Sequence, residues 1–116
     1  MQRGGLAALI RSDVDYEVRH DFSLWLEGKL ETLFIEIRSS WSEKLLFGII
    51  YKVPSFSKKD FSDVFESLLS EVAKEKKKVV LMGDFNIDLL NPDDRVDFLN
   101  TMLSSYLYPL EQFQRE

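Results

Sequence analysis

The residues Val79-Val80-Leu81-Met82-Gly83-Asp84-Phe85-Asn86 decide the fold. Four apolar residues in a row predict a strand that is buried on both faces, and such strands belong to parallel or mixed sheets covered by helices. Gly83 permits a close backbone approach that a side chain would block. Asp84 and Asn86 would project from one face, about 6.6 Å apart if extended. The pattern therefore predicts a shared polar site at the carboxyl end of a central strand, where open α/β sheets build ligand sites.

The same polar residues also have the composition of a plain turn. Gly, Asp and Asn tolerate the left-handed conformation and bond to their own backbone. On local grounds the plain turn is the favoured interpretation, since polar residues after a strand are ordinary. The order of the surrounding motifs favours a site instead.

Composition limits the class of protein. A chain of 116 residues with 45% hydrophobic and 30% charged residues predicts one folded domain. The absence of cysteine excludes a disulfide framework and a Cys-ligated metal, and fits a reducing, intracellular compartment. The net charge of -5 disfavours nucleic acid as a partner through long-range electrostatics. With no apolar run near the roughly 20 residues that span a bilayer, we expect no membrane partner.

Four further strands are expected upstream of residue 79. The short apolar run 6–10 predicts a buried strand, and 14–18 alternates as a half-exposed strand should. Residues 30–37 would place Phe34 and Glu36 opposite the face of Ile35, and 39–44 would form a hairpin loop. Residues 45–51 give a second near-continuous apolar strand, which ends at Tyr51 before Pro54.

Two helices follow from capping and periodicity. Ser57 predicts an N-cap with Asp60 three residues on. The first helix would bury one stripe, which consists of Phe61, Val64, Phe65, Leu68, Leu69 and Val72. Lysines in 74–78 would form its solvated end, where cations complement the helix dipole. Asn91 and Pro92 predict the start of a second helix. Its apolar residues Val96, Phe98, Leu99, Met102 and Leu103 would pack on the sheet.

The strand, helix, strand order of 45–86 sets the position of a third polar residue. If the two strands are parallel in one sheet, their carboxyl ends lie at the same edge. Tyr51 would then share a rim with Asp84 and Asn86. His20 is the only histidine, so a Ser-His-Asp triad would have to use it, and we interpret it as an ordinary surface residue.

Several blocks, in order, resemble the endonuclease/exonuclease/phosphatase (deoxyribonuclease I-like) superfamily. The similarity is greatest to the endonuclease domain of non-LTR (LINE-like) retrotransposon polyproteins, which carry a reverse transcriptase. The blocks are Arg3-Gly4-Gly5-Leu6-Ala7, Leu33-Phe34-Ile35-Glu36-Ile37, Gly48-Ile49-Ile50-Tyr51-Lys52-Val53-Pro54, Gly83-Asp84-Phe85-Asn86-Ile87-Asp88-Leu89-Leu90 and Ser105-Tyr106-Leu107-Tyr108-Pro109-Leu110.

The resemblance implies an α/β fold, a two-sheet α/β sandwich with helices packed outside the sheets, and Mg²⁺-dependent hydrolysis of a DNA phosphodiester. It implies that Tyr51 bonds the scissile phosphate, that Asp84 orients or deprotonates the attacking water or assists the leaving group, and that Asn86 holds Asp84 or a phosphoryl oxygen. Phosphoryl transfer relies on such placed donors and charges. A nuclear location is expected for the parent element.

The chain also departs from the family pattern. The family's metal-binding Glu lies upstream of the matching residues, and its closing Ser-Asp-His element lies beyond them. Residues that hold the metal are therefore unknown here. We expect an internal fragment, with a partial domain over 1–110 and a divergent tail over 111–116, that lacks flanking parts and is inactive alone.

Two alternatives stay open: a non-catalytic interaction module derived from that domain, and a phosphoesterase of the same superfamily acting on a lipid or nucleotide. Reading the open reading frame on both sides of this sequence would best distinguish an intact enzyme from a catalytically inactive fragment.

Overall fold

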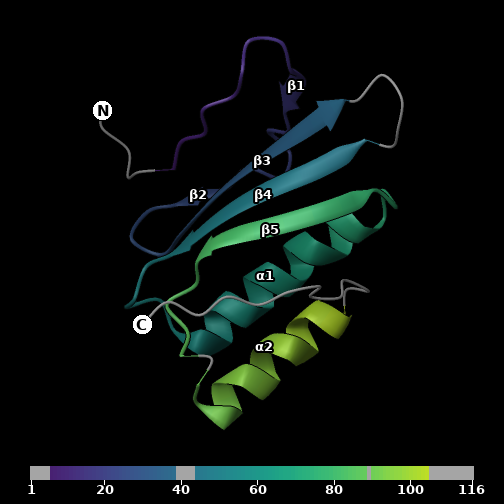
Figure 1. Ribbon diagram of the computed structural model, residues 1–116. Helices are drawn as coiled ribbons and strands as arrows, with labels where there is room; N and C mark the ends of the chain where they lie inside the picture. The colour runs from purple at the N-terminus through teal and green to yellow at the C-terminus, as the bar shows by residue number, and fades with distance from the viewer. Residues whose placement is uncertain (1–5, 39–43, 89, 105–116) are drawn as a thin grey trace.

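The described part of the chain folds into a mixed five-stranded β-sheet with two helices (Figure 1). The computed structural model describes residues 6–38, 44–88 and 90–104, with 101–104 described by their helical backbone alone. The elements, in chain order, are β1 (Asp15–Val18), β2 (Trp25–Leu26), β3 (Leu30–Arg38), β4 (Leu45–Lys52), α1 (Lys58–Ala73), β5 (Lys78–Asp84) and α2 (Pro92–Ser104). The α/β class expected from the sequence is thus confirmed.

The sheet has the order β1-β3-β4-β5, with β2 paired to the other end of β3. β3 and β4 are antiparallel neighbours, as expected of a hairpin, although residues 39–43 of the connection lie outside the described residues. β4 and β5 are parallel, and α1 connects them. This β4-α1-β5 unit brings the carboxyl ends of two strands to one edge of the sheet.

One face of the sheet packs against α1 to form the core. Alternate residues of β3 and β4 point to this face, so Phe34 and Ile50 are fully buried there. The helix contributes the stripe that its spacing predicts, with Val64 half-buried beside it. The buried residues of the stripe are Phe61, Phe65, Leu68, Leu69 and Val72.

Both helices begin where the sequence predicts. The Ser57 hydroxyl accepts a hydrogen bond from the Asp60 backbone N–H at 3.1 Å. The Asn91 side-chain oxygen accepts from the N–H groups of Asp93 and Asp94, at 3.0 and 3.3 Å. Each cap satisfies backbone donors that the first helical turn leaves without partners.

Two strand predictions were wrong. Residues 6–10 form no regular structure, and the Leu9 side chain is fully exposed, because apolar content makes a strand only where backbone groups find a pairing partner. The stretch 79–82 lies in β5, which is an edge strand of the sheet that the described residues form and not a central one. Val80 and Met82 are therefore 40% and 48% exposed on the face away from α1, and the predicted burial on both faces is not observed.

Two helix details also differ from expectation. α1 ends at Ala73, so the lysines of 74–78 follow the helix, and Lys77 makes ion pairs in place of a solvated end. α2 lies beside α1 (Figure 1), where its Phe98 ring contacts Phe85, and the expectation that it packs on the sheet was wrong. Val96 is half exposed, because α2 touches the rest of the protein along a narrower face than its apolar residues predict. The predicted tail, 111–116, lies outside the described residues.

Candidate functional site

Tyr51 and Asp84 are direct partners in the parallel register of β4 and β5. β4 ends at Lys52 and β5 ends at Asp84, so Tyr51 and Asp84 both lie at the carboxyl ends of their strands, at the same edge of the sheet. Adjacent strands lie about 4.8 Å apart, so the two residues are backbone neighbours whose side chains project from the same face of the sheet. The side-by-side position expected from the strand, helix, strand order is observed, while the catalytic roles of these residues stay a prediction.

Gly83 makes the close approach of the two strand ends possible. Its φ is +145°, and a Cβ atom at this position would lie only 1.9 Å from the Ile50 carbonyl oxygen. Real Cβ atoms do not come this close to backbone oxygen, so every other residue would push β5 away from β4. The glycine therefore holds Asp84 next to Tyr51.

Asn86 is held by the turn that follows β5. Its φ is +48°, its backbone N–H donates to Asp84 Oδ1 at 3.0 Å, and its side-chain Nδ2 donates to the Lys52 carbonyl. The extended spacing expected for Asp84 and Asn86 is thus wrong, because Asn tolerates the left-handed conformation. The turn, which was the alternative interpretation, is the one formed, and it ties the end of β5 back to β4.

The sheet edge that carries Tyr51, Asp84 and Asn86, called the rim here, is open to solvent, and a buried cation, Lys52, lies next to it. Tyr51 is 36% exposed, and Asp84 and Asn86 are exposed as well. Lys52, in contrast, points to the helix face and is 2% exposed, with Nζ 3.4 Å from the Val53 carbonyl oxygen and 6.0 Å from the Phe61 ring centroid. Burial lowers the pKa of Lys52, the charge of Lys58 lowers it further, and Asp84 opposes both effects. The only signal in the sequence that could have shown this burial was the two-residue period of β4, which places Lys52 on the same face as Leu46 and Ile50.

The donors at the rim do not fit a Mg²⁺ ion. Mg²⁺ needs oxygen ligands and is usually held by one or two carboxylates together with water and substrate phosphate. Asp84 is the single carboxylate of the three predicted residues, and its Oδ1 already accepts the Asn86 N–H. Within residues 6–38, 44–88 and 90–104 no group of three or more acidic, His or Cys side chains could hold a metal. The described part of the chain therefore supplies no metal cage.

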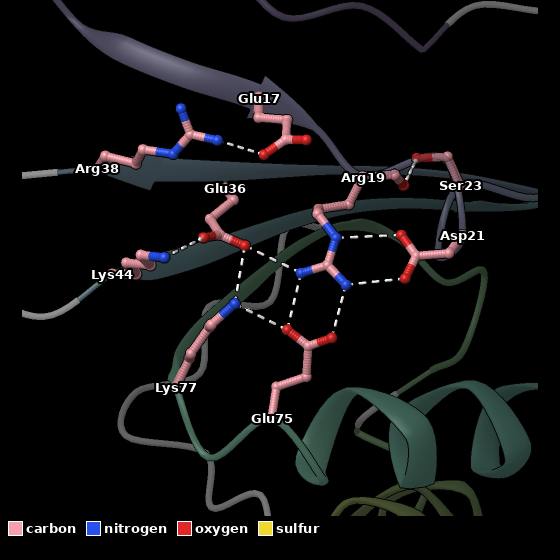
Figure 2. A network of polar contacts seen from close by, with 9 residues as sticks. All are labelled: Glu17, Arg19, Asp21, Ser23, Glu36, Arg38, Lys44, Glu75 and Lys77. Atoms are coloured by element: carbon pink, nitrogen blue, oxygen red, sulfur yellow. Dashed lines mark hydrogen bonds and ion pairs between the residues drawn. The ribbon is translucent and has the colours of Figure 1, made fainter.

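The opposite end of the sheet carries a network of ion pairs that sequence analysis missed (Figure 2). The Glu36 carboxylate accepts from Arg19 and Lys77, at 2.9 Å each. Glu75 accepts from Arg19 at 2.6 Å and from Lys77 at 2.8 Å, and Arg19 also pairs with Asp21. The network joins the loop after β1 to β3 and to the segment between α1 and β5.

The network shifts the pKa values of its members so that their charged forms are favoured. Hydrogen bonds from Arg19 lower the pKa of Glu75 from 4.5 to about 2, with a further contribution from Lys77. Lys77 and then Arg19 lower the pKa of Glu36, and Glu75 and Glu36 raise that of Lys77.

His20, next to Arg19 in the chain, is exposed as expected of a surface residue.

Comparison with known proteins gave no match: no family model, curated protein or solved structure is significantly similar to this chain. Among the described residues, neither helix is long and apolar enough to cross a membrane.

Proposed function

We propose that this chain is part of a Mg²⁺-dependent endonuclease domain of the endonuclease/exonuclease/phosphatase type, and that it does not cleave DNA by itself. The observation that carries the proposal is the register of β4 and β5, which pairs Tyr51 with Asp84 at the carboxyl ends of two parallel strands. Ligand sites of α/β sheets are commonly built at such ends.

The face of the sheet away from α1 supports the corresponding two-sheet architecture. α1 covers one face, while Val80 and Met82 stay about half exposed on the other. Soluble proteins seldom leave a continuous apolar sheet face open to water. In a two-sheet α/β sandwich this face would meet the second sheet, and the helices would lie outside.

The roles proposed for the three residues agree with their contacts. The Tyr51 hydroxyl, on an exposed side chain, is a donor suited to a phosphate oxygen. Asp84 is a carboxylate beside it and would orient or deprotonate a water molecule, or assist the leaving group. Asn86 holds Asp84 through its backbone N–H and holds β4 through its amide, so it acts as a positioning residue.

The donor set explains why we expect no cleavage by this chain. Asp84 and Glu31, the register partners of Tyr51 on its two sides, are two carboxylates at this edge, and no group of three or more acidic, His or Cys side chains among the described residues could hold a metal. Loss of one charge-stabilising donor typically costs about 10² to 10³ in rate. A site without a metal cage loses more than one such contribution.

A plasmid assay tests the proposal. Pure protein is incubated with supercoiled plasmid and Mg²⁺ or Mn²⁺, beside an Asp84→Ala variant. We expect no metal-dependent nicking from either protein. Nicking that disappears in Asp84→Ala would overturn the proposed inactivity, and would show that residues other than Tyr51, Asp84 and Asn86 complete an active site.

A second candidate function is a non-catalytic interaction module. The observation that favours it is the edge position of β5, whose exposed Val80 and Met82 offer apolar contact area to another protein. In such a module Asp84→Ala would change binding and leave a nuclease assay silent.

A further inference from the structure

β5 is an edge strand whose inner residues carry none of the usual protection against pairing with another chain. Among the residues that the structure describes, no strand pairs with its outer edge. Its five inner residues, 79–83, include neither a charge nor a proline. Charges on edge strands, prolines, bulges and short length are the devices that prevent such pairing.

The opposite edge of the same sheet is protected. β1 has four residues, two of which are Asp15 and Glu17, and both carboxylates are ion-paired to Arg38 of β3. An added strand would meet charged side chains at two of the four positions. The two edges therefore differ in length and in charge, and β5 is the one open to a partner.

The sequence of β5 is complementary to itself in one antiparallel register. With a two-fold axis at Leu81, Lys78 of one copy lies opposite Asp84 of the second copy, and Val80 lies opposite Met82. Since directly opposed residues point to the same face, the charged pair and the apolar pair both fall on the face away from α1. Parallel pairing would instead place Lys78 against Lys78, which is unfavourable.

We propose that two copies of this chain associate through β5 in this antiparallel register, which joins their sheets into one. Each dimer contains two Lys78–Asp84 pairs and two Val80–Met82 contacts, because the arrangement is symmetric. The apolar contacts cover side chains that are 40% and 48% exposed in the single copy. If one copy shifted by one residue along the other, its Val80 and Met82 would lie on the opposite face of the joined sheet from those of its partner. The Lys78–Asp84 pairs would also be lost, so these pairs fix the register.

The inference does not depend on the proposed function, because it needs an open edge and its charges and not a phosphodiester. It also has a consequence for the candidate site. Pairing places Asp84 against Lys78 of the second copy, which gives the carboxylate a partner other than a ligand.

Charge reversal tests the register. The dimer dissociation constant is measured by sedimentation equilibrium for the wild type, Lys78→Asp, Asp84→Lys and the double variant. Each single change places like charges opposite each other twice, so we expect the dissociation constant to rise at least about tenfold. The double variant restores both pairs with their signs exchanged, and we expect it to return to within about threefold of the wild type.

A matched control exchanges an exposed pair on the outer surface of α1. Lys59 and Asp63 form an i,i+4 ion pair there, and reversing both should leave the dissociation constant unchanged. Amide hydrogen exchange of the wild type gives a second measurement that needs no variant. The β5 amides should become more protected as protein concentration rises.

Three results would overturn the inference. One is a wild type that stays monomeric at its highest soluble concentration. Another is a dimer whose dissociation constant ignores both single charge reversals. The third is a dimer in which β5 amide exchange does not depend on concentration.

Discussion

The two ends of β5 use charged residues in opposite ways. At the amino end, the Glu36 side chain is 5% exposed and has Arg19 and Lys77 within 2.9 Å. At the carboxyl end, Asp84 is exposed and its Oδ1 accepts a hydrogen bond from one backbone N–H, that of Asn86. The carboxylates of the first end hold elements together. In a single copy of the chain, the carboxylate of the second end is exposed to solvent.

Physical chemistry explains why the two ends differ. A buried carboxylate is tolerated only if paired, and removing its partners leaves an uncompensated charge. An exposed carboxylate keeps its hydration and needs no partner, so it contributes little to stability. Substitutions at the amino end should therefore lower the free energy of unfolding strongly, while those of exposed side chains at the carboxyl end should change it little. Gly83, whose role lies in the backbone, is the exception.

The largest effect is expected from Gly83→Val. The added Cβ would lie 1.9 Å from the Ile50 carbonyl oxygen at a φ of +145°, so β5 must separate from β4 or the chain must unfold. We expect a loss of about 4 kcal/mol or more in the free energy of unfolding, measured by urea denaturation. Gly28→Ala is the control: its φ is +70° but its Cβ would meet nothing within 4 Å, so it should cost about 1 kcal/mol. Equal losses would contradict the steric explanation.

Removal of the buried carboxylate should have the next largest effect. Glu36→Ala leaves Arg19 and Lys77 with Glu75 as their shared acceptor. We expect the free energy of unfolding to fall by about 2 to 4 kcal/mol. Glu36→Gln keeps an acceptor oxygen and should cost less. A loss below about 0.5 kcal/mol in Glu36→Ala would show that the network is as weak as an ordinary surface ion pair.

Acid should weaken the same end of the sheet. The pKa of Glu75 is lowered to about 2 from 4.5, so its contribution to stability is fully present above pH 4.5 and is lost as the pH falls toward 2. The pKa values of Asp21 and Glu36 are lowered too, which acts in the same direction. We expect the free energy of unfolding, measured by denaturation at each pH, to fall over this window by about 1 to 3 kcal/mol. The decline should be shallower in Glu75→Gln, and identical profiles would rule out Glu75 as a cause.

The same substitution at the other end should have a small effect. Asp84→Ala removes one exposed acceptor for the Asn86 N–H, and we expect a loss of about 0.5 to 1 kcal/mol in the free energy of unfolding. Glu36→Ala and Asp84→Ala each remove a carboxylate from the same sheet, so the difference between their losses measures the effect of burial and pairing. A loss as large as that of Glu36→Ala would mean that Asp84 is a structural residue.

Local patterns predicted the helices and the two inner strands. Ser57 and Asn91 are capping residues whose effect acts within one helical turn, and the apolar stripe of α1 needs only a period of 3.6 residues. β3 and β4 followed from long apolar or alternating runs. The position of Tyr51 beside Asp84 could also be predicted, since parallel strands joined by a helix end at the same edge.

Non-local contacts explain what sequence analysis missed. The exposure of β5 depends on which strand, if any, lies beside it, and four apolar residues do not carry that information. The ion-pair network combines Arg19, Glu36 and Glu75, which lie far apart in the chain. The turn at Asn86 was one of two open interpretations, because the same residues suit a turn and a site.

Cross-linking tests the central claim, that β4 and β5 end side by side at Tyr51 and Asp84, most directly. The chain has no cysteine, so a Tyr51→Cys/Asp84→Cys variant carries the only two thiols. Disulfides join residues whose Cα atoms lie about 4.4 to 6.8 Å apart, which adjacent strands satisfy. The control is Leu45→Cys/Asp84→Cys, whose residues lie at opposite ends of the paired strands, about 20 Å apart. After oxidation at low protein concentration, we predict an intramolecular disulfide by mass spectrometry in the first variant and not in the control. Free thiols in the first variant, or equal cross-linking in both, would contradict the account.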